Sequence, residues 1–512
     1  MSSRALQWLS LVGIIWLQSI NGTSFNFPSY SSQFKHQLSM SQLQLNNLAF
    51  ASDAGKLFGF VSGFAANSLP LWLVLVIGSS LGLVGYGVQY LFITNKLHDP
   101  SYWVIFLLTV LAGNSICWIN TVCYIVAIRN FKAHRHVAVG ISTSYQGLSA
   151  KIYTDIVESM FSKRSSKRTE TFLLLNSVLP LGVSVLVSPF VRVHVVEEQG
   201  GLEIGVFLIF MITIATGFFA VFTSLGSIST KLSPLTGLVG ILVFLLLPLA
   251  VAVAENVKRK TEQPEKTEQP EKQRDAVEAA MEEIGAKEML KRMNFWLHFG
   301  VYFFGATLGL VFLNNLGQIA ESRRSSGVSS LVSLSASFGF FGRLAPSLLD
   351  HFFPGKLMKS KPGWMVALLG AMCGGFFLLL WPTDMSLCTS TAIIAGCTGA
   401  ITSIAVSVTT ELFGADNFSI NHNLVVANIP LGSFLFGSLA GFLYRMQVPA
   451  GAGKCIGVEC YRAVFFIWGC LCLVGTLLAL VLFARTRSFY STKRRMVEDS
   501  PPLHVLPLSI VS

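Results

Sequence analysis

The chain has 512 residues, of which 52% are hydrophobic and only 12% are charged, and its mean hydropathy is +0.60. This composition excludes an ordinary soluble globular protein and indicates a polytopic membrane protein. A formal net charge of +11 would suggest a nucleic-acid partner if the protein were soluble. Here the basic residues lie mostly between apolar segments, so we expect a lipid bilayer around the protein and no nucleic-acid partner.

Apolar windows long enough to cross the hydrocarbon core, for which a helix needs about 20 residues, occur along most of the chain. They form groups of six, two and six, which predicts an all-α protein with about fourteen spans. The window 137–158 is the weakest, because it carries Lys151, Asp155 and Glu158, and a total of twelve spans stays open. The windows are 5–25, 45–66, 71–93, 102–127, 137–158, 172–191, 203–227, 234–254, 295–316, 328–349, 363–383, 386–410, 421–444 and 462–484.

Lysine and arginine in the connections predict the orientation. With the N-terminus inside, the inner segments hold 22 of these residues and the outer segments hold 11. This bias predicts cytoplasmic termini. The loop 162–170, predicted to be outer, opposes the rule with four cations.

A polar break at 255–294 divides the chain. It contains KTEQPE twice in tandem at 260–271, which we expect to be disordered, and then 274–293, which can form an amphipathic helix on the inner membrane face. The segment is interpreted either as a solvated linker between the two halves or as a regulatory segment. The expected domains are 1–254 (a six-helix bundle plus two spans), the cytoplasmic linker 255–294, the bundle 295–484 and the cytoplasmic tail 485–512.

Arg343 is the first candidate binding residue. It lies well inside the window 328–349, where a charge costs several kcal/mol and usually faces a cavity or a partner. The sequence Gly342-Arg343-Leu344 matches Gly55-Lys56-Leu57 in the second window of the chain. We therefore expect equivalent spans of two halves, each with one cation near the membrane midplane. The alternative is that Arg343 snorkels to the interface or pairs with Asp350.

Lys56 and Asp53 are three residues apart on one helical face, so they predict an ion pair that either switches during function or stays neutralised. Other polar residues in the windows are candidates for the border of a cavity. These are Asn21, Gln146, Tyr302, Asn314 and Asn428.

Motifs typical of soluble enzymes, such as HExxH and CxxC, are absent from the sequence. We therefore expect no catalytic residue, no metal site and no cofactor, and the protein is not expected to be an enzyme. Seven of the nine cysteines lie in apolar windows. Cys455 and Cys460 share a predicted outer loop and are a candidate disulfide, with free thiols as the alternative.

The stretches 21–63 and 137–156, together with NNLGQI at 314–319 and ELFG at 411–414, resemble plant nodulin-like proteins of the major facilitator superfamily, a group that includes those named for a nuclear-fusion defect. The resemblance implies two six-helix bundles around a central cavity, working by alternating access. The window with Arg343 further resembles oxalate and monocarboxylate carriers, in which the equivalent arginine meets a carboxylate. The chain departs from the oxalate carrier, which has a lysine where His422, Asn423 and Asn428 lie here.

These observations predict a secondary transporter of a small organic solute, most simply an organic anion, with proton coupling as one option. A membrane receptor or sensor on the same scaffold is the alternative. The expected location is the plasma membrane or an organellar membrane such as that of the vacuole.

Overall fold

The computed structural model describes residues 3–98, 101–132, 134–161, 167–194, 202–224, 233–261, 283–325, 327–353, 360–449 and 455–498. Within these ranges the chain is helical and has no strand. Each of the fourteen predicted windows coincides with a helix or a broken helix. Parts of other predictions lie outside the described residues, namely 162–166, nearly all of the tandem repeat, the start of the amphipathic segment at 274–282 and the tail from 499.

The N-terminal half is built from six helical units. The second is broken at a 3-10 turn, and a short segment with its own small helices precedes it. The elements are α1 (Ser3–Asn21), η1 (Phe27–Ser29), α2 (Ser31–Gln37), α3 (Gln42–Ala54), η2 (Gly55–Phe58), α4 (Gly59–Ser68), α5 (Leu71–Ile93), α6 (Tyr102–Asn130), α7 (Arg135–Met160) and α8 (Lys167–Val187).

The C-terminal half repeats the count of six, with breaks in its first and fifth units. The break in the first is a π-helical turn, η3. The elements are α14 (Met293–Tyr302), η3 (Phe303–Thr307), α15 (Leu308–Asn314), α16 (Leu316–Ser322), α17 (Val328–Phe352), α18 (Lys361–Leu378), α19 (Asp384–Phe413), α20 (Phe418–Val426), α21 (Asn428–Met446) and α22 (Glu459–Glu498).

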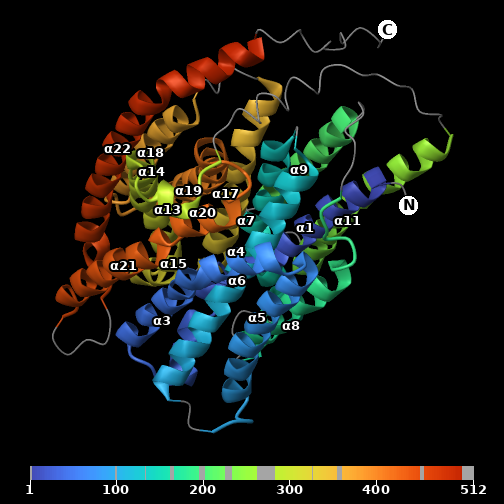
Figure 1. Ribbon diagram of the computed structural model, residues 1–512. Coiled ribbons are helices and arrows are strands. Elements are labelled where there is room, and N and C mark those ends of the chain that lie inside the picture. The colour runs from blue at the N-terminus through green and yellow to red at the C-terminus, as the bar shows by residue number, and fades with distance from the viewer. Residues whose placement is uncertain are drawn as a thin grey trace, which may run out of the picture.

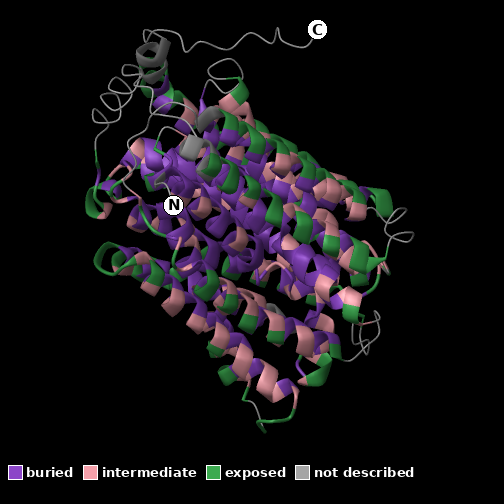
Figure 2. Cartoon of the chain, turned by 90° about the vertical axis from the view of Figure 1, so that its right-hand side faces the viewer, coloured by how far each residue is buried: buried purple, intermediate pink, exposed green. Residues whose placement is uncertain are grey.

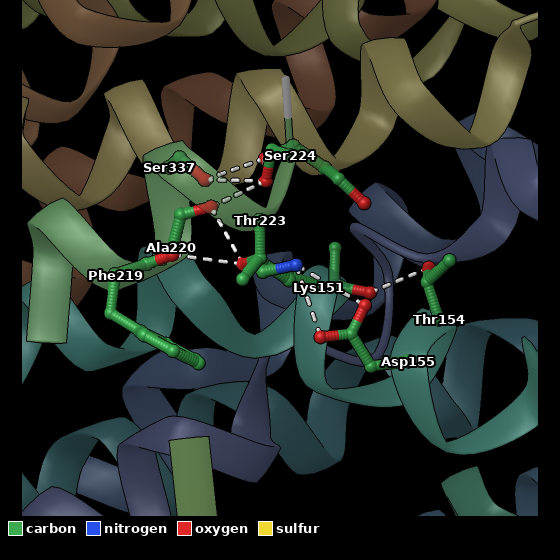
Figure 3. Close-up of polar contacts among 10 residues, drawn as sticks. Lys151, Thr154, Asp155, Phe219, Ala220, Thr223, Ser224 and Ser337 are labelled. Atoms are coloured by element: carbon green, nitrogen blue, oxygen red, sulfur yellow. Dashed lines mark hydrogen bonds and ion pairs between the residues drawn. The ribbon is translucent and has the colours of Figure 1, made fainter. Parts of the chain in front are cut away.

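Two additional helices, α9 (Leu202–Ser224) and α11 (Pro234–Thr261), lie between the halves in sequence and pack with the N-terminal half. They contact each other, α1 and α7, and α9 also reaches α17. Figure 3 shows the junction, where Ser224 of α9 lies 3.1 Å from the hydroxyl of Ser337 in α17. The buried pair Lys151–Asp155 of α7 lies beside it, with 3.0 Å between nitrogen and oxygen.

The halves meet along the second and fifth units of each. In Figure 1, α7 and α17 run side by side through the centre, with the blue helices of the N-terminal half and the orange-red helices of the C-terminal half on either side. The second contact joins α3 and α4 to α21 and α20. Phe340 and Leu344 of α17 belong to the hydrophobic cluster of the N-terminal half, so this helix is a seam between the two bundles.

The surface of the helices is apolar where lipid would cover it. Side chains such as Trp103, Leu107, Ile204 and Phe442 are more than 60% exposed. Figure 2 shows the buried residues gathered along the middle of the molecule and the exposed ones outside. Among the described residues, eleven helical segments are long and apolar enough to span a membrane. The units that fall short are α1, α3–α4 and α7, so the total of fourteen stays a prediction.

Two details differ from the expected boundaries. The last helix, α22, runs to Glu498 and so continues into the segment expected to be a tail. In the described part of the break, the predicted amphipathic helix is reduced to the four residues of α13 (Ala286–Met289). Ile284 and Met289 are buried there, because this end of the linker packs on the C-terminal half instead of lying free on the membrane face.

Candidate functional site

A cavity lies between the two halves. It is lined by residues from both bundles, including four of the predicted site residues (Lys56, Gln146, Tyr302 and Arg343), and the rest of its wall mixes apolar, aromatic and polar side chains. The lining residues are Gly22, Ser24, Phe25, Lys56, Ile116, Cys117, Asn120, Thr121, Tyr124, Gln146, Tyr302, Leu310, Arg343, Thr402, Phe418, Ser419, His422, Asn423, Val426 and Ile429. A smaller cavity shares Phe25, Leu310 and Arg343 with it.

Arg343 is held in place by unusually close helix packing. A Cβ added at Gly342 would lie 2.0 Å from the carbonyl oxygen of Gly396, so α17 and α19 touch backbone to backbone. On the other side, a Cβ at Gly147 of α7 would lie 3.0 Å from Nη1 of Arg343. These glycines leave room for the guanidinium at the seam, where the side chain is only 5% exposed.

The Arg343 guanidinium has few partners. Its Nη1 donates to the carbonyl oxygen of Gly339 at 3.3 Å, and its carbon lies 5.6 Å from the centre of the Phe25 ring. Nε is buried and without a hydrogen bond. Within the described residues no carboxylate pairs with Arg343, and Asp350 lies instead 3.8 Å from Lys361. The alternative in which Arg343 pairs with Asp350 therefore has no support in the structure.

Lys56 lies in the 3-10 turn that breaks the second unit. Its Nζ is 2.5 Å from Oδ1 of Asp53, and Nδ2 of Asn314 donates to Oδ2 of the same carboxylate at 3.1 Å. The predicted pair therefore exists, and Asn314 links it to the other half. A Cβ at Gly55 would lie 2.1 Å from the carbonyl oxygen of Val110 in α6.

This contact of Gly55 mirrors that of Gly342. In each half a glycine in the second unit packs against the backbone of the fourth unit, and the next residue is a cation on the cavity wall. The expectation of equivalent spans, drawn from Gly-Lys-Leu and Gly-Arg-Leu, thus has a structural counterpart.

A network of amides forms another wall. Nδ2 of Asn21 donates to Oδ1 of Asn120 at 2.9 Å, and Nε2 of Gln146 donates to the same oxygen at 3.2 Å. Gln146 and Asn120 line the cavity, whereas Asn21 lies behind them. Asn21 and Asp53 therefore do not line the cavity themselves, but each contacts a residue that does.

Tyr302 lines the cavity at the residue before the π turn, a local irregularity that often marks functional sites. Asn428 does not line either cavity. Its Oδ1 accepts a hydrogen bond from Thr307, the last residue of that turn, and its Nδ2 donates to the carbonyl oxygen of Phe299 at 3.5 Å. Asn428 thus supports the turn after Tyr302.

Sequence reasoning did not select several cavity residues. Phe25, Tyr124 and Phe418 are aromatic residues in an aromatic-rich sequence, which gives no signal of their position. His422 was noticeable as a histidine in an apolar window; its ring stacks on Phe418 at 5.0 Å and its Nδ1 has no hydrogen-bond partner. No cluster of residues suited to a metal ion occurs within the described ranges.

Cys455 and Cys460 are joined by a disulfide, with 5.8 Å between their Cα atoms. They lie at the start of α22 and its preceding turn, far in sequence from the cavity residues of α17. The disulfide thus lies in the connection between α21 and α22.

Solved transporters of the major facilitator superfamily have the same fold. The proton:xylose symporter XylE matches with a TM-score of 0.56 at 10% identity, over 93% of this chain and 95% of its own. A structure of proton-dependent oligopeptide transporters matches with a TM-score of 0.53 at 12% identity, over 97% of this chain and 100% of its own. FucP in the outward conformation matches with a TM-score of 0.52 at 11% identity, over 94% of this chain and 99% of its own. The protein is thus a multi-pass membrane protein with the fold of this transporter class.

The family follows from sequence. Residues 7–253 match the family model described as nodulin-like, and residues 278–492 match the model described as the C-terminal domain of NFD4. Protein NUCLEAR FUSION DEFECTIVE 4 of Arabidopsis thaliana is 36% identical over 98% of this chain and 92% of its own length. The chain belongs to this nodulin-like family, as its stretches 21–63 and 137–156 predicted.

Proposed function

We propose that the protein is a secondary transporter of a small organic anion, with a carboxylate bound at Arg343. The observation that carries the proposal is that buried lysines of the helices have a carboxylate partner, whereas Arg343 has none among the described residues. Lys56, Lys151 and Lys361 each lie within 3.0 Å of a carboxylate oxygen, from Asp53, Asp155 and Glu411 respectively. Arg343 is buried equally deeply, borders the cavity and has no such partner among the described residues.

A buried charge without a counter-charge is costly, and breaking a buried pair typically costs about 3–5 kcal/mol. A solute carboxylate in the cavity would supply the missing negative charge. Guanidinium offers two parallel N–H donors that match the two oxygens of a carboxylate, which lysine does not.

The position of the site between the two halves would allow the solute to be carried across the membrane. Solute bound at the seam of α7 and α17 contacts both bundles, and its binding biases the equilibrium between states open to either face. The membrane concerned is the plasma membrane or an organellar one such as that of the vacuole, with cytoplasmic termini and fourteen spans.

Proton coupling would involve Asp53. Two of the similar structures are described as proton-coupled or proton-dependent transporters. Protonation of Asp53 would remove the negative partner of Lys56 and leave the ammonium free to attract an anion. The alternative is a pair that stays neutralised for structural reasons. The variant Asp53→Asn distinguishes these two hypotheses. If the pair switches during transport, uptake by the variant should no longer respond to a pH gradient. If the pair is structural, the variant should yield less folded protein.

The direct test is uptake by proteoliposomes that contain the purified protein. Labelled short-chain carboxylates, aromatic acids, amino acids and sugars would be compared with empty liposomes. We expect saturable uptake of at least one carboxylate, competed by other anions and not by neutral sugars. Uptake of neutral solutes only would contradict the anion proposal, and saturable binding without uptake would favour the receptor alternative.

A further inference from the structure

The chain from the end of α1 to the end of α2, residues 22–37, lies against the cavity. Gly22, Ser24 and Phe25 contribute to the wall of the larger cavity, and Phe25 and Pro28 contribute to the smaller one. Phe25, Leu310 and Arg343 border both spaces, so they form the partition between them. A solute that passed from the smaller to the larger cavity would have to pass Phe25.

This segment is attached firmly to the N-terminal half. Asn26 exchanges two hydrogen bonds with Asn176 of α8, at 2.8 and 3.3 Å, and the ring of Tyr30 stacks on Phe172 of the same helix at 5.3 Å. The backbone N–H of Gly22 donates to the hydroxyl of Ser149 in α7 at 3.0 Å.

The Gly22 attachment leaves no space. A Cβ at Gly22 would lie 2.7 Å from Cβ of Ser149 and 3.0 Å from the carbonyl oxygen of Gln146, so the segment begins in close contact with α7. On another helix, α5, the hydroxyl of Tyr86 donates to Thr23 at 3.1 Å. The segment is thus bound to α5, α7 and α8, all helices of one half.

Its contacts with the C-terminal half are different in kind. The Phe25 ring faces the Arg343 guanidinium, and the Pro28 carbonyl lies against Gly317 of α16, where a Cβ would be 3.1 Å away. The hydroxyl of Ser32 donates to Oε1 of Glu321, an exposed contact. None of these three contacts buries a hydrogen-bonded pair, so they can separate at lower cost than the attachments to the N-terminal half.

We propose that residues 22–37 form a lid, carried by the N-terminal half, which closes the cavity on this face of the protein with Phe25 as its plug. When the halves move apart, the lid stays with α5, α7 and α8 and leaves α16 and α17. Arg343 then exchanges the Phe25 ring for the open cavity. The inference deepens the proposed function, since the lid guards the same site.

Native Cys117 provides a probe that needs no solute, because it lines the larger cavity behind Phe25. A membrane-impermeant methanethiosulfonate is added to the face of sealed vesicles on which the lid lies, and modification of Cys117 is followed by peptide mass analysis. Phe25→Ala should raise the labelling rate severalfold. Phe27→Ala is the matched control, since Phe27 is half-buried two residues away and faces neither cavity, and its rate should equal that of the wild type.

A second variant holds the lid closed. Ser32→Cys with Glu321→Cys replaces a hydrogen-bonded pair, and oxidation should join the lid to α16. We expect labelling of Cys117 to fall about tenfold or more on oxidation and to recover with reductant, because an open state of a few per cent would be removed. Ser32→Cys alone should show no change.

The outcomes separate the two proposals. Unchanged labelling in both the bridged protein and Phe25→Ala would overturn the lid, whatever the uptake experiment shows. Labelling that responds as expected, together with no uptake of any acid by the wild type, would keep the lid and contradict the anion transporter.

Discussion

Gly342→Ala tests the packing that positions Arg343. The new methyl would lie 2.0 Å from the carbonyl oxygen of Gly396, where ordinary contact begins at 3.4 Å, so α17 and α19 would have to separate by roughly 1.4 Å. Overpacking of this kind costs about 1–3 kcal/mol, and the backbone cannot yield as a flexible side chain would. Alanine also gains about 0.5–1 kcal/mol over glycine in a helix, which offsets only part of the loss.

The control is Gly370→Ala in α18, where no atom lies within 4 Å of an added Cβ. The measurement is thermal unfolding of the purified proteins in one detergent. We expect the midpoint of Gly342→Ala to lie below that of the wild type, and that of Gly370→Ala to be equal or higher. A Gly342→Ala protein as stable as the wild type would refute the close contact of α17 with α19.

Three predictions concern the rest of the chain. Mass analysis of native protein should find Cys455 and Cys460 bridged, two mass units lighter than after reduction; two free thiols would contradict this. Deletion of 260–271 should leave a protein that reaches its membrane, because the repeats contain no predicted span, and degradation would show that they are structural. Labels near Ala5 and Lys258 should be accessible from the same side, whereas opposite sides would mean an odd number of spans between them and would place 137–158 in doubt.

The sequence predicted the helices well because hydrophobic length is a strong signal in membrane proteins. It also selected Arg343 and Lys56, since a cation deep in an apolar window requires an explanation. The repeated Gly-cation-Leu pattern indicated the correspondence of the second units, and the contacts of Gly55 and Gly342 agree with it.

Other features depend on the three-dimensional arrangement and leave no local trace. Asn428 and Gln146 are both amides in apolar windows, yet one supports the π turn and the other lines the cavity. Phe25 has no property in the sequence that distinguishes it from Phe27. Its position is set by contacts of its segment with α7 and α8, whose residues are more than one hundred positions away.

The most direct test of the account is uptake of a carboxylate by Arg343 variants, corrected for the amount of protein in the membrane. Arg343→Lys keeps the charge and loses the paired donors, so we expect a steep fall in uptake with normal expression. Arg343→Gln should abolish uptake, and Lys56→Gln should weaken the affinity for anions more than for any neutral solute. Normal uptake by Arg343→Gln would contradict the anion site and leave a carrier of neutral or cationic solutes on the same scaffold.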